Sequence, residues 1–185
     1  MLTELSEVVC DTVAEIYNKS LRTRDIPDDW RLANVQLCLN KEKSHLCQTT
    51  EYRPISLTVT LCKVLESIMS DKIIDHLERY TLIRDSQLSF VKQKSCLTNL
   101  LIFMQKVTNY LDSSYPVDVI GLYLDFQKAF DKVPHKRLLM KLQAHRIDRE
   151  LLRWIKEWLS GRRQRVVIYG QYSSWIDVLS GVSQG

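Results

Sequence analysis

The chain has 185 residues, of which 45% are hydrophobic and 26% charged, with only five Gly and four Pro. This composition excludes a disordered or low-complexity protein, and the length is sufficient for one ordinary domain or two small ones with a buried core. The apolar runs are shorter than the roughly 20 residues of a membrane-spanning helix, and acids occupy the first residues where a signal peptide would carry bases. We therefore expect an intracellular protein, cytoplasmic or nuclear, with no membrane partner.

In the N-terminal half, hydrophobic periodicity predicts three helices. Residues 4–21 form an amphipathic pattern, and residues 59–80 form a second one. A third pattern begins after Ser95, which is a suitable N-cap, and its apolar stripe is expected to be core. Residues 31–50 between the first two helices are polar and are expected to be irregular.

The C-terminal half combines strand and helix signals. The apolar run that ends at residue 126 predicts a strand buried on both faces, and Pro134 is suited to the first turn of the next helix. Asp148 is a suitable cap for a further helix that Gly161 would close. Residues 164–181 contain two β-rich runs around a turn and predict a hairpin. The expected fold class is α+β, with a boundary near residue 115.

Cysteine usage indicates reduced thiols, because the five cysteines are scattered and form no Cys-x-x-Cys pair. Cys38, His45 and Cys47 could supply three metal ligands, but structural zinc requires four with tighter pairing. We interpret these three side chains as incidental neighbours in a loop.

Charge is distributed unevenly although the net charge is only +4. Residues 1–30 hold seven acids and three bases, whereas residues 136–165 hold ten bases and three acids. Such a basic segment suits binding to a phosphate backbone, and a solvated basic helix face is the alternative. The candidate nucleic-acid contacts are Lys136, Arg137, Lys141, Arg162 and Arg163.

Asp125 follows the predicted strand, and a carboxylate there can project from a sheet rim and hold a divalent cation through hard oxygen. Enzymes that use two metal ions require several such carboxylates from separate segments. A turn or cap role before the next helix is the alternative. Spacing alone leaves both open.

Four segments resemble motifs of reverse transcriptases from non-LTR, LINE-type retrotransposons, in the order of that family. The stretch LYLDFQKAFDKVPH (122–135) is similar to the first catalytic motif. EYRPISLTVTLCKVLESI (51–68) resembles the fingers motif, SFVKQKSCLTNLL (89–101) the next one, and SGVSQG (180–185) the start of the following palm motif. The resemblance implies a right-hand polymerase with a helical lead-in over 1–30, fingers over 31–116 and a partial palm over 117–185.

The resemblance also implies roles for individual residues around a catalytic metal. Asp125 would bind catalytic Mg²⁺ beside the backbone carbonyl of Phe126. Phe130 would lie beneath the incoming sugar and occupy the space of a ribose 2′-hydroxyl, although an ordinary core aromatic is the alternative. Asp131 is interpreted as a turn cap or ion-pair partner and not as a metal ligand.

The nucleotide pocket of the family implies three further contacts. Gln184 and Gly185 would line it, the first through its amide and the second by allowing close backbone approach. Arg53 would bind the triphosphate, and a loop brace is the alternative. The implied partners are an RNA template, a DNA primer and deoxynucleoside triphosphates, and the resemblance leaves the oligomeric state open.

The family also requires a second acidic motif, an aromatic-x-Asp-Asp hairpin after the Gln-Gly motif. The only adjacent aspartates here are Asp28 and Asp29, which precede the fingers motif. We therefore expect a chain truncated before this motif and without polymerase activity on its own. The alternatives are a non-catalytic nucleic-acid-binding remnant, a structural relic, or a fragment of the related group II intron type.

Overall fold

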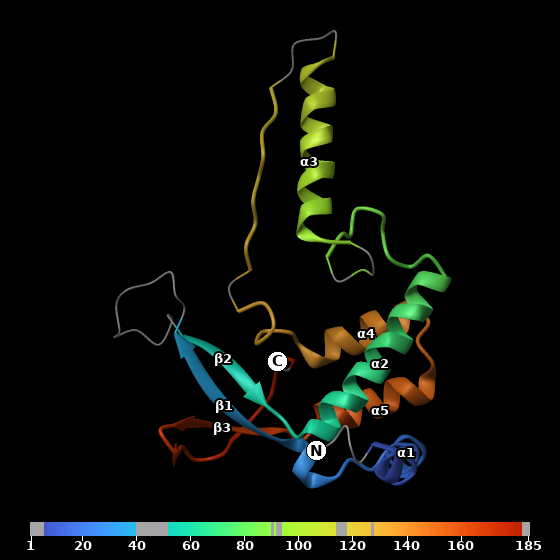
Figure 1. Ribbon diagram of the computed structural model, residues 1–185, viewed down its shortest axis with the longest axis vertical. Helices are drawn as coiled ribbons and strands as arrows, with labels where there is room; N and C mark the ends of the chain where they lie inside the picture. Colours follow the sequence, from blue (N-terminus) through green and yellow to red (C-terminus); the bar gives the residue numbers. More distant parts are fainter. Residues whose placement is uncertain are drawn as a thin grey trace. The chain divides into compact units, whose positions relative to one another are not determined.

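The computed structural model describes residues 6–39, 52–89, 91, 94–113, 118–126 and 128–182. The chain divides into two compact units, one of residues 1–70 with 128–185 and the other of residues 71–127 (Figure 1). The mixture of helices and a sheet confirms the α+β class. The assignment of segments to lead-in, fingers and palm stays a prediction.

The first unit contains a mixed sheet in the order β2-β1-β3-β4. Strand β1 (Leu32–Leu39) pairs antiparallel with β2 (Tyr52–Leu57) and parallel with β3 (Arg163–Ile168). The expectation of irregular structure from residue 31 is therefore wrong over β1, while residues 40–50 lie outside the described residues. The strand signal is the alternation of apolar Ala33 and Val35 with Asn34 and Gln36, because successive strand residues face opposite sides.

The predicted hairpin is confirmed. Strand β3 turns back into β4 (Gln171–Tyr172), and the same returning segment pairs with β3 again at β5 (Ile176–Asp177). Tyr169 and Gly170 form the two-residue turn with φ values of 48° and 78°. Two positive φ values are typical of the type I′ turn that matches strand twist.

The predicted helices are also confirmed. They are α1 (Ser6–Thr23), α2 (Thr60–Arg79), α3 (Cys96–Leu111), α4 (His135–Ala144) and α5 (Arg149–Leu159). A short 3₁₀ helix, η1 (Asp28–Arg31), was not predicted. Ser95 caps α3 by accepting from the Thr98 amide, and Asp148 caps α5 by accepting from two amides. Gly161 follows α5 with a φ of 63°, as expected for a residue that ends a helix.

Helices α1, α2 and α5 pack with η1 around an aromatic core. Trp30 meets Tyr17 and Trp158 edge-on at centroid distances of 5.9 and 6.1 Å, and Trp154 stacks on Trp158 at 4.9 Å. Offset and edge-to-face pairs of this kind add to the stabilisation from burial alone. Leu65 is fully buried beneath them.

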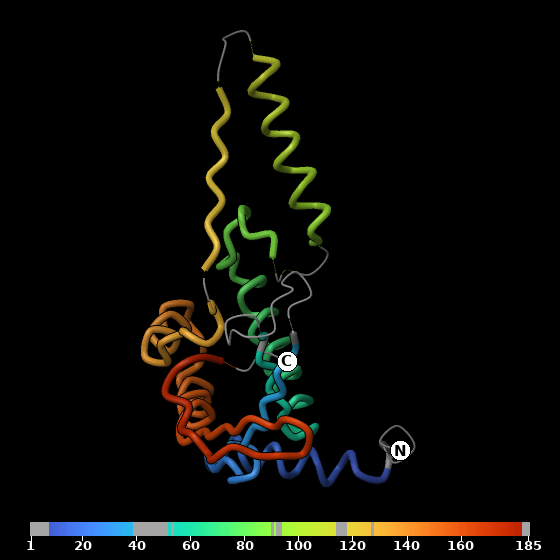
Figure 2. The backbone as a smooth tube through the Cα atoms, turned by 90° about the vertical axis from the view of Figure 1, so that its left-hand side faces the viewer, coloured from blue at the N-terminus to red at the C-terminus, as the bar shows by residue number. Residues whose placement is uncertain are grey.

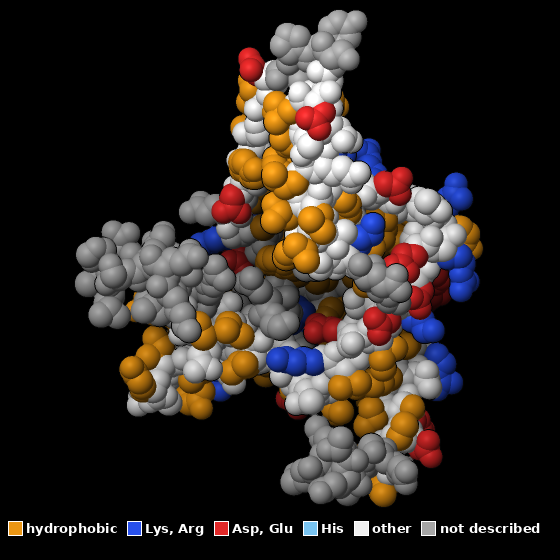
Figure 3. Space-filling model, turned by 45° about the horizontal axis from the view of Figure 1, so that its top comes forward, with side chains coloured by type: hydrophobic (Ala, Val, Ile, Leu, Met, Phe, Trp, Pro, Cys, Tyr) orange, Lys and Arg blue, Asp and Glu red, His pale blue; other side chains and the backbone are white. Residues whose placement is uncertain are grey.

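Two expectations for the second unit are wrong. Residues 118–126 run as extended chain without strand pairing (Figure 2), and Ile120 and Leu122 are 92% and 82% exposed. The apolar stripe of α3 is exposed as well, and hydrophobic side chains follow this helix in Figure 3. Apolar sequence favours burial only where a partner surface is present, and the described residues of this unit provide none.

No described helix combines the length and the apolar character needed to cross a bilayer.

Candidate active-site pocket

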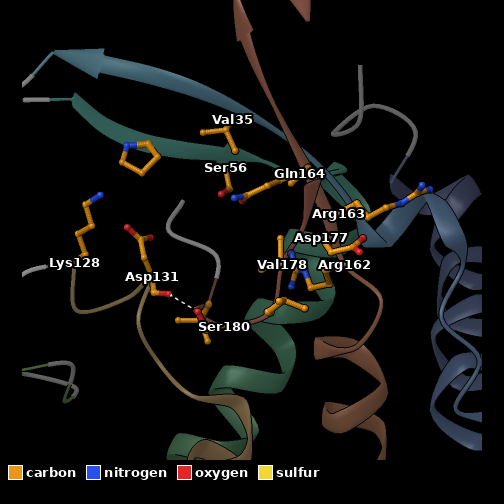
Figure 4. Close-up of a pocket in the computed structure, with 15 residues that line it drawn as sticks. Val35, Ser56, Lys128, Asp131, Arg162, Arg163, Gln164, Asp177, Val178 and Ser180 are labelled. Atoms are coloured by element: carbon orange, nitrogen blue, oxygen red, sulfur yellow. Dashed lines mark hydrogen bonds between the residues drawn. The ribbon is translucent and has the colours of Figure 1, made fainter. Parts of the chain in front are cut away.

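A polar pocket of about 430 Å³ lies in the first unit against one face of the sheet (Figure 4). Alternate residues of three strands form its floor. They are Ala33 and Val35 from β1, Pro54 and Ser56 from β2, and Gln164 from β3. Because a strand turns every second side chain to the same side, the register of β1 with β2 and β3 brings these five residues to one face.

The wall of the pocket joins two segments that are about fifty residues apart. The Gly181 amide donates to the Val133 carbonyl at 2.9 Å, and the Val182 amide donates to the Phe130 carbonyl at 3.1 Å. These bonds fasten the loop after β5 onto the turn before α4. We call the hydrogen-bonded pairing of residues 180–182 with residues 130–135 the clamp.

Two side chains complete the clamp. The Ser180 hydroxyl donates to the Asp131 carbonyl at 3.1 Å, and His135 Nε2 lies 2.7 Å from the Gly181 carbonyl, where an imidazole N–H donates. Gly181 has a φ of +90°, and a Cβ there would lie 2.7 Å from the Asp131 carbonyl oxygen. Only glycine allows the two backbones to approach this closely.

The charged groups of the wall face the sheet. In Figure 4, Lys128 and Asp131 extend from the turn toward the strands that carry Val35 and Ser56. Arg163 also lines the pocket where β3 begins, but its side chain is directed away from the cavity in the same view. A lysine ammonium at the rim offers a point charge to an anionic ligand.

Among the described Lys and Arg side chains, Arg162 is the most buried, at 8% exposure. Its guanidinium lies 4.0 Å from the Glu66 carboxylate and 5.8 Å from the Trp158 ring centroid. Burial lowers the pKa of Arg162, and the Glu66 carboxylate opposes that shift. Arg162 thus serves the packing of α2 on α5, and its guanidinium is directed to protein groups.

A buried thiol adjoins this ion pair. Cys62 is completely buried, and burial followed by the charge of Glu66 raises the pKa of its thiol to about 11. A protonated thiol at neutral pH is inert as a nucleophile or metal ligand. Cys62 is therefore a core residue of the first unit.

The remaining predicted site residues are placed as follows. Asp125 and Phe126 are exposed and belong to the unit of residues 71–127. Phe130 is 42% exposed beside the clamp, and β2 pairs the backbone of Arg53 with Cys38. Gln184 and Gly185, like the side chain of Arg53, lie outside the described residues. The exposed bases of α4 are Lys136, Arg137 and Lys141.

The part of the chain that the structure describes contains no group of three or more His, Cys, Asp or Glu side chains that could hold a metal ion. Asp125 is a single exposed carboxylate, and a two-metal site needs several. The described residues by themselves do not fit such a site. Of the three possible zinc ligands, Cys38 is exposed, and His45 and Cys47 lie outside the described residues.

Sequence reasoning missed the pocket contributions of Lys128 and Gly181. Both lie within motifs that the resemblance singled out, but neither residue type marks a pocket by itself. Gly181 carries the clearest signal, because an isolated glycine between β-rich and polar residues often marks a close approach of two backbones.

Comparison with known proteins decides the family. The family model described as reverse transcriptase (RNA-dependent DNA polymerase) matches residues 39–185. The chain belongs to the reverse transcriptase family. It is 26% identical over 170 residues to a probable RNA-directed DNA polymerase from transposon X-element of Drosophila melanogaster. It is 31% identical over 172 residues to the RNA-directed DNA polymerase from mobile element jockey of Drosophila funebris.

Both alignments cover 92% of this chain but 18% of each relative. A third relative, the Pol polyprotein from type-1 retrotransposable element R1 of Bradysia coprophila, is 29% identical over 172 residues and covered to 16%. The chain thus spans less than a fifth of the length of these relatives. The resemblance to reverse transcriptases of non-LTR retrotransposons is confirmed.

Proposed function

We propose that this reverse transcriptase chain forms part of the nucleotide-binding region of an RNA-directed DNA polymerase from a LINE-type retrotransposon. The observation that carries the proposal is the clamp, because it joins the two motif segments 122–135 and 180–185 at the wall of one polar pocket. In this proposal residues 1–30 lead into fingers over 31–116, and the palm begins at residue 117.

The proposed ligand is a deoxynucleoside triphosphate paired to an RNA template at a DNA primer end. Phe130 is proposed beneath the sugar, and its partial exposure supports a ring available to a ligand. Gln184 and Gly185 are proposed to line the same nucleotide pocket, because they follow Val182 in the sequence and the Val182 amide donates to the Phe130 carbonyl. Arg53 is proposed for the triphosphate, which a guanidinium can grip through two nitrogens.

We further propose that Asp125, with the Phe126 carbonyl, contributes to a Mg²⁺ site in the parent enzyme. An exposed carboxylate is accessible to a hydrated cation, which supports this role. The other ligands must come from residues outside the described part of the chain. We therefore expect no nucleotidyl transfer by this chain alone.

Primer extension tests the proposal. The chain alone and a version extended through the next acidic motif are each assayed with Mg²⁺, deoxynucleotides and a primed RNA template. We expect extension only by the longer protein, and its loss in Asp125→Asn but not in the exposed control Asp118→Asn. Full activity of Asp125→Asn in the longer protein would overturn the assignment.

A second candidate function is non-catalytic binding of nucleic acid. The supporting observation is the exposure of Lys136, Arg137 and Lys141 on α4, together with Arg163. Arg162 is left out of this set because its guanidinium faces Glu66 and Trp158. Binding that depends on these bases must weaken steeply as salt rises. Affinity that is absent at low salt, or that ignores salt, would remove this candidate.

A further inference from the structure

The hairpin carries arginines that lie over aromatic rings. The Arg165 guanidinium carbon lies 4.0 Å from the Tyr172 ring centroid and 4.5 Å from that of Trp175. Arg163 lies 5.9 Å from the same Trp175 ring. We call these four residues the arginine–aromatic ladder.

The ladder lies on the sheet face opposite the pocket floor. Arg165 pairs in register with Asn34 and donates from Nε to the Asn34 side-chain oxygen at 2.8 Å. Their neighbours in the register, Val35 and Gln164, line the pocket. Since adjacent strand residues face opposite sides, the pocket and the ladder occupy the two faces of one sheet.

The stacking leaves the arginine able to bind a ligand. Contact with a ring covers the flat face of a guanidinium but leaves its N–H groups in the plane, directed outward. The Asn34 bond uses one of the five donors of Arg165. The rings also restrict the side chain, so less conformational freedom is lost when a phosphate binds in two-pronged fashion.

The rings themselves remain accessible. Tyr172 is 58% exposed and Trp175 is 36% exposed, and Tyr169 at the tip of the turn is fully exposed. Exposed aromatic faces beside fixed positive charge match a strand that presents unstacked bases and phosphates alternately. A duplex keeps its bases stacked inside and offers only the phosphates.

We propose that the arginine–aromatic ladder binds a single-stranded polynucleotide, with Arg165 on a phosphate and Trp175 or Tyr172 stacked on a base. The proposal rests on the polynucleotide-binding role of the family, but it places the strand on the sheet face opposite the pocket floor, with Arg163 bordering both surfaces. Asp177 is opposite Arg163 in the register and reduces the local charge there, so Arg165 is the decisive arginine.

Fluorescence anisotropy of a labelled oligouridylate of about 16 nucleotides measures the binding. The same length of oligodeoxythymidylate and of RNA duplex is titrated in parallel, between about 50 and 200 mM salt. We expect both single strands to bind more tightly than the duplex. Equal or tighter binding of the duplex would overturn the proposal, as would absence of binding by the unaltered protein.

Two substitutions separate the two halves of the ladder. Arg165→Gln should weaken binding and reduce the slope of log affinity against log salt by about 0.7, the share of one phosphate contact on a single strand. Trp175→Ala should weaken binding at least about fivefold with an unchanged slope, because stacking releases no counterions.

Controls use an exposed arginine and an exposed aromatic residue elsewhere in the chain. Arg22→Gln on α1 and Tyr110→Ala on α3 should leave affinity and salt slope unchanged. Arg165→Lys keeps the charge but not the stacked fork, and should keep the slope while losing affinity. Thermal melts confirm that each variant is folded.

The outcomes distinguish the ladder from the other proposals. Loss of binding in the α4 variants Lys136→Gln and Arg137→Gln, with Arg165→Gln and Trp175→Ala unaffected, would overturn the ladder and leave the basic helix as the binding surface. Failure of primer extension by the longer protein would instead concern the pocket, since anisotropy needs no catalysis.

Discussion

Substituting alanine for Gly181 tests whether the clamp forms the wall of the pocket. The added Cβ would lie 2.7 Å from the Asp131 carbonyl oxygen and 2.9 Å from its Cα. Both are backbone atoms, which cannot rotate aside as the end of a flexible side chain can. The φ of +90° is also unfavourable for any residue with a Cβ. The loop must therefore detach from the turn or the backbone must shift.

The expected loss of stability follows from these two effects. A left-handed backbone costs an L-residue about 1–2 kcal/mol. Each clamp hydrogen bond contributes about 1 kcal/mol net, and detachment breaks the bonds from Gly181 to Val133 and from Val182 to Phe130. We expect Gly181→Ala to lower the unfolding free energy by about 3 kcal/mol.

Urea denaturation followed by tryptophan fluorescence measures this loss. All four tryptophans, Trp30, Trp154, Trp158 and Trp175, belong to the first unit, so the signal reports the unit that contains the clamp. At about 2–4 °C per kcal/mol for a domain of this size, a parallel thermal melt should shift by about 6–12 °C.

Gly170 provides the matched control. It has a φ of +78°, but nothing lies within 4 Å of the position its Cβ would take. Gly170→Ala therefore adds only the conformational cost of about 1–2 kcal/mol. Equal destabilisation by Gly170→Ala and Gly181→Ala would refute the reasoning, because the close approach of the two segments would then contribute nothing.

Three further predictions concern the core and its border. The Ser20 hydroxyl accepts a hydrogen bond from Trp154 Nε1 at 3.2 Å. Ser20→Ala should lower the unfolding free energy measured in urea by about 1–3 kcal/mol, because the buried indole N–H loses its partner. An unchanged urea midpoint would contradict this. Cys62 should resist alkylation by iodoacetamide at about pH 8, whereas the exposed thiols of Cys10, Cys38 and Cys96 should react, and peptide mass spectrometry would follow both. Its raised pKa makes its contribution to stability complete below the ordinary value of 9.0 and lost as pH rises toward 11, so a flat stability profile there would exclude the burial. The Arg24 guanidinium lowers the pKa of Glu150, so this ion pair stabilises the fold above pH 4.5 and stabilises it less as the pH falls below that value. Glu150→Gln should remove this part of the acid dependence of the urea midpoint. An unaltered acid dependence in the variant would count against the pair.

Local signals predicted the helices and the hairpin well. Ser95 and Asp148 satisfy amide donors at helix starts through bonds that span two or three residues, so a short stretch of sequence contains the whole interaction. The same is true of the turn at Tyr169 and Gly170, which sets the register of the strands on either side.

Pairing between distant segments could not be predicted in this way. Strand β1 lies beside β3 although more than a hundred residues separate them, and no local pattern encodes which strands become neighbours. The expectation for residues 118–126 failed for a related reason. Their β-forming side chains favour extended backbone, but a strand exists only where another backbone accepts and donates the ladder hydrogen bonds.

The clamp could not be predicted from the sequence. Nothing in the composition of residues 180–182 indicates that they pair with residues 130–135, and the resemblance supplied the two motifs but not their contact. Lys128 and Asp131 lie in the turn before α4 and reach the pocket because the clamp holds this turn beside the sheet.

Strand β3 explains how one small sheet can carry a proposed site on each of its two faces. Gln164 is directed to the pocket floor and Arg165 to the ladder, so neighbouring residues of one strand belong to different surfaces. A shift of the β1–β3 register by one residue would exchange the two sets and destroy both surfaces together. The Arg165 bond to Asn34, between residues paired in the observed register, stabilises the alignment that keeps the pocket floor and the stacked arginine on opposite sides. The parallel pairing of β1 with β3 is therefore the element on which the geometry of both proposed sites depends.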